Sequence, residues 1–384
     1  MAATDSNYNE EMQLFRHMVL RFLEQKVLPY YDTWEKNHHM PREIWNTMGN
    51  AGILLVDFPE KYGAAAASFD VCQMIQEEMC RLNLAGLAGG YNIHANIVAP
   101  YLLHVGNQQQ QDRWLPAMVT GKVVTAIAMT EPGAGSDLAG IRTKAVKDGD
   151  DYILNGSKTF ITNGIHADMI IVCAKTDINA GSKGISLFLV DTSLPGFSRG
   201  NPIEKIGQHS SDTAELFFEN MRIPSDALLG EEGKGFMYLM QELPRERLGV
   251  AVQAIGHAQG ALDLTCDYVK ERKAFGQSVS QFQNTRFKLA QCQTELEMCR
   301  ALLEKYMLKY QRDEMTVTDA ARLKLAATEM QLTMVNECLQ LFGGYGYTDE
   351  YPISRFYRDA RIQTIYAGSS EIMKEVIARD ILGR

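Results

Sequence analysis

The sequence predicts an α+β protein in which a helical region, a central antiparallel β region and a second helical region follow one another. Apolar residues recur at three- and four-residue steps over residues 8–118, as in amphipathic helices. Short β-rich runs separated by turn residues occupy residues 122–229, and helical periodicity returns after Gly230. These changes of pattern predict domains at residues 1–119, 120–231 and 232–384.

The first region carries a stripe of apolar side chains that includes Leu14, Met18 and Phe22. Pro29 interrupts this stripe because proline lacks a backbone donor, and glycine-containing turns recur further along the region. We therefore expect several helices here rather than one.

The central region should form a sheet or barrel built from hairpins. Its β-rich runs lie at residues 123–129, 170–174, 185–190 and 215–218. The stretches Asp148-Gly149-Asp150 and Asn155-Gly156 are typical of tight hairpin turns, since their residues tolerate positive backbone angles. Two such signals favour antiparallel pairing over alternating strands and helices.

The third region contains long helical stretches near residues 246–272, 281–312 and 317–341. Helices of this length, joined by short connections, suit an antiparallel bundle. Arg272 closes the first stretch; an arginine there could grip a phosphate, although helix ends also attract arginine through the helix dipole.

Composition restricts the classes of function. The net charge of −9 disfavours nucleic acid as the main partner, and no apolar run is long enough for a membrane span. Seven scattered cysteines without a C-x-x-C pair disfavour both a disulfide framework and a metal site. Residues 1–11 resemble neither a signal nor a transit peptide, so we expect the cytoplasm, or the mitochondrial matrix if a transit peptide was removed.

Several glycine-rich segments could carry chemistry, although each has a plain structural explanation. Residues 130–137 (T-E-P-G-A-G-S-D) could bring backbone amides close to a ring or phosphate, or could be a surface turn. Residues 155–164 could be a simple hairpin strand. Residues 342–347 (F-G-G-Y-G-Y) end a helical pattern and lack the spacing of a dinucleotide fingerprint.

In this order and at these separations, the segments closely resemble the acyl-CoA dehydrogenase family over the whole chain. The T-E-P-x-A-G-S-D, R-x-x-F-G and Y-x-G-S-S-E-I patterns are specific when they occur together. The resemblance implies a C-terminal four-helix bundle and FAD held between the second and third domains and across a subunit boundary. It also implies an acyl-CoA substrate and a homo-oligomer, which we expect to be a tetramer.

The resemblance implies a position for FAD. Thr130 and Thr162 should face the flavin ring, Phe160 should cover it, and Ser136 should lie near a pyrophosphate. Arg272 and Gln283 should help to hold the adenine end of a neighbouring subunit's FAD. The full predicted set is Ile127, Met129, Thr130, Gly135, Ser136, Phe160, Ile161, Thr162, Arg272, Phe275, Gln283, Gln340, Leu341, Gly343, Gly344, Ser369, Ser370 and Glu371.

The resemblance also implies where the substrate binds, and residues 89–96 should border the acyl tail. Within that segment His94 is more simply explained as a core histidine with satisfied hydrogen bonds than as a catalytic group. The predicted substrate-binding residues are Ser136, Tyr91, Met237, Arg247, Ala367 and Gly368.

The position of the catalytic base departs from most of the family. The usual glutamate precedes the glycine of the Y-x-G-S-S segment, where this chain has Ala367. Removal of an α-proton requires a base, and Glu246 is the best candidate, because similar long-chain and isovaleryl-type members carry a glutamate there. Glu371 and Glu337 are alternatives. Without the resemblance, Glu246 reads as an exposed residue in the first turn after Pro244.

The expected reaction is α,β-dehydrogenation of a medium-, long- or branched-chain acyl-CoA. Glu246 would take the α-proton while hydride leaves for flavin N5, and the thioester oxygen would accept hydrogen bonds from the Ala367 amide and the flavin ribityl chain. Electron-transfer flavoprotein is the implied acceptor. Competing functions are an acyl-CoA oxidase, a nitroalkane-oxidase-like flavoenzyme and a non-catalytic scaffold that kept the fold.

Overall fold

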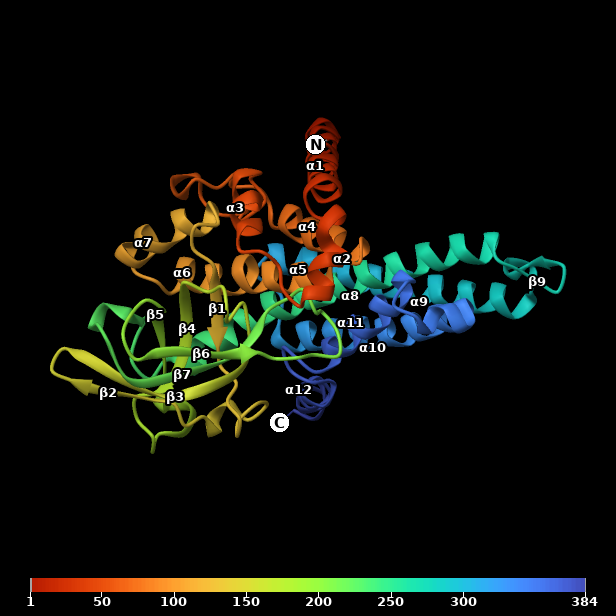
Figure 1. The fold of residues 1–384 in the computed structure, drawn as a ribbon. Coiled ribbons are helices and arrows are strands. Elements are labelled where there is room, and N and C mark those ends of the chain that lie inside the picture. Colours follow the sequence, from red (N-terminus) through yellow and green to blue (C-terminus); the bar gives the residue numbers. More distant parts are fainter. Residues whose placement is uncertain (1, 384) are drawn as a thin grey trace.

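The protein is described as a computed structural model that covers residues 2–383, with side chains from Glu10 onward. Met1 and Arg384, the outermost residues of the first and third predicted domains, lie outside the described residues. N-terminal helices cover both a β-sheet and one end of a long helical bundle (Figure 1). The predicted α+β fold is therefore confirmed.

Several helices form the N-terminal region, as predicted. Pro29 lies in the first turn of the second helix, where its missing N–H costs nothing, and Asn107 and Gln110 form a capping box at the start of the last helix. The helices are α1 (Ala2–Lys26), α2 (Leu28–Asn37), α3 (Glu43–Asn50), α4 (Phe69–Arg81), α5 (Ala85–Tyr91), a π-helical stretch (Asn92–Val98), α6 (Ala99–His104) and α7 (Gln108–Val119).

The central region forms one sheet of eight strands; three of the predicted β-rich runs lie within strands, and the run at residues 123–129 contains the shorter strand β1. The strand order is β6-β7-β3-β2-β4-β5-β8, with β1 beside β4. The strands are β1 (Thr125–Ala128), β2 (Lys144–Asp148), β3 (Asp151–Thr162), β4 (Met169–Lys175), β5 (Ile185–Asp191), β6 (Phe197–Pro202), β7 (Thr213–Ile223) and β8 (Leu228–Leu229).

The sheet is mainly antiparallel, as predicted, and two of its pairings are parallel. β1 pairs with β4 in parallel, and β2 meets β4 in parallel at Lys144 and Lys175. The chain between β1 and β4 contains a loop and the β2–β3 hairpin, which is long enough for the crossover that parallel pairing needs.

One of the two predicted hairpin turns is present. Gly149 and Asp150 connect β2 to β3, whose residues Asp148 and Asp151 face each other. The prediction at Asn155-Gly156 is wrong, because these residues continue β3 at an irregularity in its pairing with β7. Gly156 has φ +149° and lies against Thr143, so the glycine permits a close approach of two segments rather than a turn.

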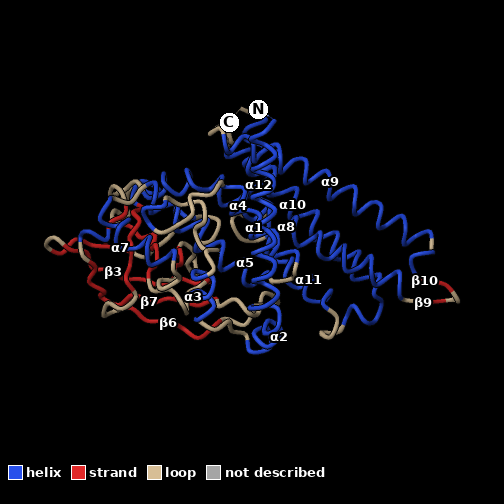
Figure 2. The backbone as a smooth tube through the Cα atoms, turned by 90° about the horizontal axis from the view of Figure 1, so that it is seen from above, coloured by secondary structure: helices blue, strands red, loops and turns tan. Residues whose placement is uncertain are grey.

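The C-terminal region is a helical bundle whose far end carries a two-stranded hairpin (Figures 1 and 2). α8 begins eleven residues before the predicted stretch at 246 and continues through Pro244, because buried side chains such as Tyr238 and Leu239 extend its packing. The elements are α8 (Gly235–Glu271), β9 (Lys273–Ala274), β10 (Gln277–Ser278), α9 (Gln283–Gln311), α10 (Val317–Phe342), α11 (Pro352–Ala360) and α12 (Ser370–Leu382).

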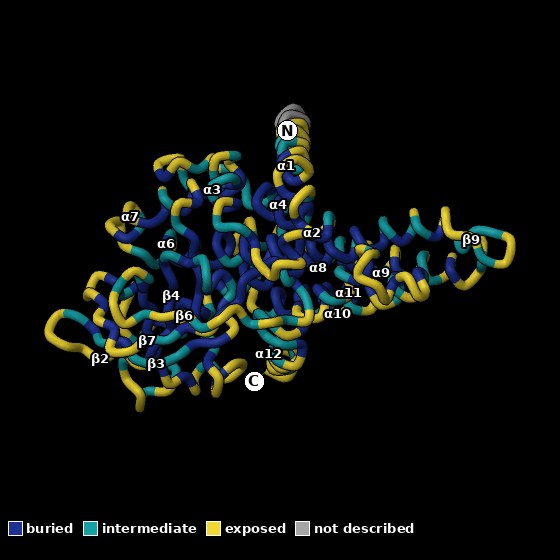
Figure 3. The backbone as a smooth tube through the Cα atoms, in the orientation of Figure 1, coloured by how far each residue is buried: buried dark blue, intermediate teal, exposed yellow. Residues whose placement is uncertain are grey.

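α8 is the helix that joins the regions. It packs against α4 of the N-terminal region and against α9 and α10 of the bundle, and it is buried over most of its length, whereas the hairpin around β9 is exposed (Figure 3). One apolar core combines residues of the N-terminal helices, of β4 and β5 and of the start of α8. The three predicted domains share this core, and we keep their boundaries as a proposal.

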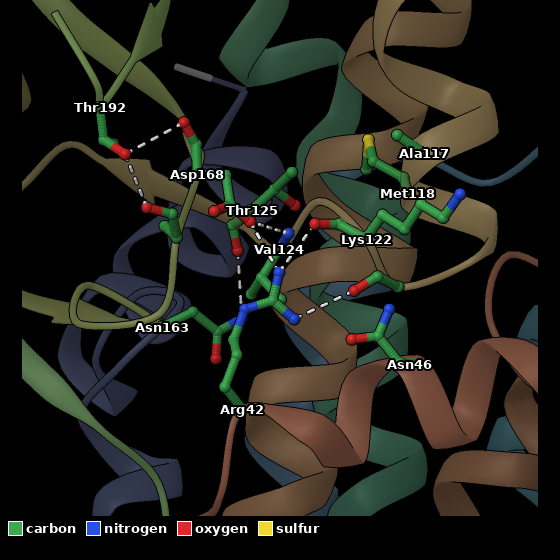
Figure 4. A network of polar contacts seen from close by, with 12 residues as sticks. Arg42, Asn46, Ala117, Met118, Lys122, Val124, Thr125, Asn163, Asp168 and Thr192 are labelled. Atoms are coloured by element: carbon green, nitrogen blue, oxygen red, sulfur yellow. Dashed lines mark hydrogen bonds and ion pairs between the residues drawn. The ribbon is translucent and has the colours of Figure 1, made fainter.

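A polar network also ties the N-terminal helices to the sheet (Figure 4). Arg42, directly before α3, donates to the carbonyl oxygen of Gly121 at 3.0 Å and to Asp168 Oδ2 at 2.8 Å. Asp168 also accepts from the Val124 amide at 2.8 Å. The network fixes the starts of β1 and β4 against α3. No helix described between residues 2 and 383 is both long and apolar enough to cross a membrane.

Gly156→Ala should destabilise the fold more than Gly149→Ala. Both glycines have positive φ, but a Cβ at Gly149 meets nothing within 4 Å, whereas one at Gly156 collides with Thr143. We expect a loss of unfolding free energy of roughly 1 kcal/mol at Gly149 and roughly 2–4 kcal/mol at Gly156, measured by urea unfolding. Equal losses would show that the close contact with Thr143 has no energetic role.

Candidate active site

A buried carboxylate lies near the middle of the molecule. Glu246 is only 3% exposed, and its Oε1 accepts a hydrogen bond of 2.9 Å from the hydroxyl of Tyr101 on α6. The interpretation of Glu246 as an exposed residue in a first helical turn is wrong, because α8 begins at Gly235 and continues through Pro244. The helix therefore carries this carboxylate inward on a buried face.

Burial raises the pKa of Glu246 to about 7, from an ordinary value of 4.5. The Tyr101 hydrogen bond and the charge of Arg247 oppose this rise, whereas the nearby Glu242 carboxylate adds to it. The pKa of Tyr101 lies well above its usual range, first because of its own burial and then because of Glu246. The phenol thus stays protonated and donates, and Glu246 can gain or lose a proton near neutral pH.

The π-helical stretch Asn92–Val98 precedes α6 and sets where Tyr101 points, since a π turn shifts the rotation of every following residue. This stretch overlaps the segment predicted to border an acyl tail. His94 within it is fully buried; its Nδ1 lies 3.0 Å from Thr125 Oγ1 and its Nε2 3.1 Å from the Met118 carbonyl oxygen. The interpretation of His94 as a satisfied core histidine is confirmed.

Arg247, the next residue on α8, is buried, and its Nε and Nη1 atoms have no acceptor among the described residues. It lies beside the loop of Ala367 and Gly368, because a Cβ on Gly368 would sit 3.5 Å from Arg247 Nη2. Lys324 of α10 donates to the Gly368 carbonyl oxygen at 2.9 Å. Two cationic side chains thus meet this loop, and the free donors of Arg247 fit an oxygen-rich ligand.

The loop between β1 and β2 is held against β3 by a buried ion pair. Lys158 Nζ lies 2.8 Å from Glu131 Oε1 and also donates to the Met129 carbonyl oxygen at 2.9 Å. The Thr159 amide donates to the Thr130 carbonyl oxygen at 3.0 Å. Burial would raise the pKa of Glu131, but Lys158 and amide donors hold it below its usual value.

This arrangement brings the first group of predicted FAD residues together on the loop and on β3. Phe160 has φ +58° and a side chain that is 64% exposed, so a flat apolar ring is presented beside the loop. Met129, Thr130 and Thr162 are half-buried, whereas Ile127 and Ile161 are buried in the sheet. Gly135 and Ser136 are exposed at the tip, where their backbone amides can approach a ligand.

A second group of predicted FAD residues lines a cavity of about 460 Å³ at the bundle, which contains Arg272, Gln340, Leu341, Gly343 and Gly344. The Arg272 guanidinium lies 5.2 Å from the centre of the Tyr345 ring, which makes a flat cationic and aromatic surface. Such a surface fits the adenine and phosphates of FAD.

Other predicted residues lie apart from these groups. Phe275 sits in the hairpin at the bundle tip and is 95% exposed, and Gln283 is exposed at the start of α9. Met237 is exposed near the start of α8. Tyr91 is fully buried, and its hydroxyl donates to the Ile53 carbonyl oxygen at 3.2 Å.

The last predicted group lies at the start of α12. Ser369 caps the helix by accepting from the Ile372 amide, and Ser370 hydrogen-bonds Glu329. Glu371 is exposed, and a backbone hydrogen bond is the first cause that holds its pKa below the usual value. Glu337 pairs with Lys288 on the outside of the bundle. Neither alternative base is buried as Glu246 is, because Glu371 is exposed and the Glu337 side chain is partly exposed.

Sequence reasoning missed several residues of the site. Tyr101 is 145 positions from Glu246, and nothing in the pattern links them. Neither Lys324 nor the pairing of Lys158 with Glu131 was predicted from the sequence. Glu242 precedes Glu246 by four residues, a spacing that places both on one helical face, but the helix predicted from the sequence began only near residue 246.

Comparisons with known proteins agree with this arrangement. The chain matches the acyl-CoA dehydrogenase N-terminal domain over residues 9–122, the middle domain over residues 126–221 and the C-terminal domain over residues 233–382. A long-chain specific mitochondrial acyl-CoA dehydrogenase from Sus scrofa is 45% identical over 377 residues, which cover 98% of this chain and 87% of that protein.

Solved structures are similar along their whole length. An acyl-CoA dehydrogenase from Geobacillus kaustophilus is 47% identical with a TM-score of 0.95, covering 97% of this chain and 98% of that one. A glutaryl-CoA dehydrogenase from Mycobacterium smegmatis, solved in complex with FADH2, is 29% identical with a TM-score of 0.91, covering 97% of this chain and 95% of that one.

The raised pKa of Glu246 predicts a pH-dependent loss of stability. The folded protein retains a proton at Glu246 up to about pH 7, whereas an unfolded glutamate releases it near 4.5, so stability falls as pH rises through this window. Relative to Glu246→Gln, the wild type should lose on the order of 3 kcal/mol of unfolding free energy between pH 4.5 and pH 8.

The measurement is chemical unfolding of both proteins across this pH range. Glu371→Gln is the control, because the lowered pKa of Glu371 gives an effect of the opposite sign. A constant difference between wild type and Glu246→Gln would contradict a buried carboxylate that titrates near neutrality.

Proposed function

The chain belongs to the acyl-CoA dehydrogenase family, a class of FAD-dependent oxidoreductases of fatty acid metabolism that act on the CH–CH bond of an acyl-CoA, and we propose that Glu246 is its catalytic base. The observation that carries this proposal is that Glu246 is a buried carboxylate with a pKa near neutrality and a phenol donor. A base needs this proton affinity to take an α-proton and then release it.

The chain's own residues account for proton removal. Glu246 accepts the proton from the α-carbon, and Tyr101 holds the accepting carboxylate in one orientation through its 2.9 Å hydrogen bond. When bound, FAD accepts the hydride that leaves the β-carbon. An acyl chain that fills the site excludes water and should raise the pKa of Glu246 further, which makes it a stronger base.

The loop at Ala367 supports the thioester. Ala367 has φ +52° and Gly368 φ +92°, so the loop makes a left-handed turn. An alanine here keeps the amide of the usual family residue but provides no carboxylate, so the amide can donate to the thioester oxygen while the base comes from α8. The free donors of Arg247 beside this loop can neutralise negative charge on the same oxygen.

We propose a medium-, long- or branched-chain acyl group as the substrate. The 45% identity with a long-chain specific relative supports this range, as does a base on α8, which removes a side chain from the loop at Ala367. Electron-transfer flavoprotein is the proposed acceptor by family resemblance. Tyr91, Met237 and Ser136 remain proposed substrate contacts, and the cytoplasm remains the proposed compartment.

We propose that the protein assembles as a homo-oligomer, a tetramer by family resemblance. Large apolar side chains are exposed on the bundle, including Phe275, Tyr347 at 91%, Phe287 and Met298. Apolar surface of this kind commonly marks a subunit interface. The cavity of Arg272 and Tyr345 opens on the same bundle, so a second copy could complete it with its own cofactor.

Anaerobic flavin reduction tests the proposed base. Wild type and Glu246→Gln are mixed with short, long and branched acyl-CoAs, and flavin bleaching is followed by absorbance. We expect the wild type to bleach fastest with long or branched chains and the variant to bleach about 10²–10⁴-fold more slowly while still binding the thioester.

The matched controls are Glu371→Gln and Glu337→Gln, which should bleach like the wild type. Equal bleaching by wild type and Glu246→Gln would move the base to one of these residues. No bleaching of the wild type by any thioester would favour the non-catalytic scaffold or the nitroalkane-oxidase-like function, and rapid reoxidation by oxygen would favour an oxidase.

Disrupting the apolar face of the bundle should separate the subunits and weaken FAD binding together. Phe275→Asp combined with Phe287→Asp places two charges on the proposed interface, and light scattering with FAD content measures the result. Ile178→Asp, an exposed position in the central domain, is the control and should change neither property. A monomeric wild type with a full complement of FAD would contradict the proposed shared site.

A further inference from the structure

A second carboxylate and a histidine lie beside Glu246. Glu242 precedes Glu246 by one helical turn, so both carboxylates project from the same face of α8. Glu242 is buried, and its Oε1 lies 2.7 Å from Nδ1 of His104 on α6. The His104 side chain is 49% exposed, so the pair of His104 and Glu242 extends from the solvent to the neighbourhood of Glu246.

His104 reaches solvent through a cavity of about 240 Å³. Its walls include Phe69, Pro100 and Leu103, and its charged groups are His104, Asp57 and Arg245. Asp57 and Arg245 form their own ion pair of 2.6 Å, so they largely compensate each other. The imidazole of His104 is therefore the ionisable side chain of this cavity that lies in hydrogen-bond contact with Glu242.

The charged and titratable groups that act on Glu246 come from three elements. Tyr101 on α6 and Cys173 on β4 are buried and neutral, because burial raises the pKa of both side chains. Arg247 contributes a fixed positive charge from α8. Glu242 is thus the anion in this group, and its charge is the one that a neighbouring imidazole can compensate.

We propose that Glu242 and His104 form a positioning pair that sets the proton affinity of Glu246 according to the charge of His104. This inference rests on the proposed role of Glu246 as the base. With a neutral imidazole, the full charge of Glu242 faces Glu246 and favours its protonated form. With an imidazolium, Glu242 is compensated and Glu246 gives up its proton more readily.

The pair has a consequence for the enzyme. A positive charge at position 104 lowers the proton affinity of Glu246, so the base stays ionised further into the acidic range than it does beside a neutral side chain at that position. If the pair of Glu242 and His104 served only packing, its variants would change the stability of the fold. They would not shift the titration midpoint of Glu246 in a direction that depends on the charge of each variant.

Infrared titration of the holoenzyme without substrate tests this inference. The carbonyl band of protonated Glu246 is assigned by its loss in Glu246→Gln and followed with pH. Glu242→Gln should lower the midpoint by about one pH unit or more, because it removes an anion. His104→Gln should raise the midpoint, and His104→Lys, a permanent cation, should lower it.

The control variant is Glu78→Gln, which removes a similarly buried carboxylate of α4 that pairs with Arg16 of α1, and it should leave the midpoint unchanged. The double variant His104→Gln with Glu242→Gln should titrate like Glu242→Gln alone, since the histidine acts through the carboxylate. His104 is half-exposed, so its two variants should fold even if Glu242→Gln does not.

Shifts in the same direction for His104→Gln and His104→Lys, or no shift in either, would overturn the inference. Flavin reduction by an acyl-CoA separates this failure from failure of the proposed function. If Glu246→Gln still reduces flavin, Glu246 is not the base, whatever the titration shows. If flavin reduction requires Glu246 but the titration midpoint of Glu246 does not depend on the charge at position 104, the pair of Glu242 and His104 is only structural.

Discussion

The hydrogen bond from Tyr101 to Glu246 joins two helices around a carboxylate that has lost nearly all of its hydration. A buried anion without compensation would be very costly, so its surroundings must supply a donor and a balance of charge. The π-helical stretch before α6 sets the direction of the Tyr101 side chain. α8 supplies Glu242, which precedes Glu246 in the sequence, and Arg247, which follows it. The result is a carboxylate that can exchange its proton near neutral pH.

The position of Glu246 on α8 explains how one carboxylate can lie close to several parts of the molecule. α8 packs against the N-terminal helices and the bundle, and the loop of Ala367 lies beside Arg247 of α8 and accepts a hydrogen bond from Lys324 of α10. A base on this rigid, buried helix is held by packing rather than by a loop. The loop at Ala367 then needs only a backbone amide and a left-handed turn, which alanine provides at a modest conformational cost.

The order of helical and β regions was predictable from periodicity, since amphipathic stripes and β-rich runs are local signals. The turn at Gly149 was equally local. The turn predicted at Gly156 was wrong, because Gly156 permits a close contact with Thr143. No residue near Gly156 in the sequence indicates that contact. Glu246 was predicted because Ala367 stands where most of the family has the catalytic glutamate. The roles of Tyr101 and His104 depend on contacts between α6 and α8, which sequence spacing does not encode.

A measurement that isolates proton removal tests Glu246 as the base most directly. A 3-oxoacyl-CoA has acidic α-hydrogens but no hydrogen on its β-carbon that could leave as hydride, so its α-exchange in deuterated water reports the base alone. We expect the wild-type holoenzyme to accelerate this exchange, and Glu246→Gln to bind the thioester without exceeding the spontaneous rate. Equal acceleration by both proteins would show that another group takes the proton.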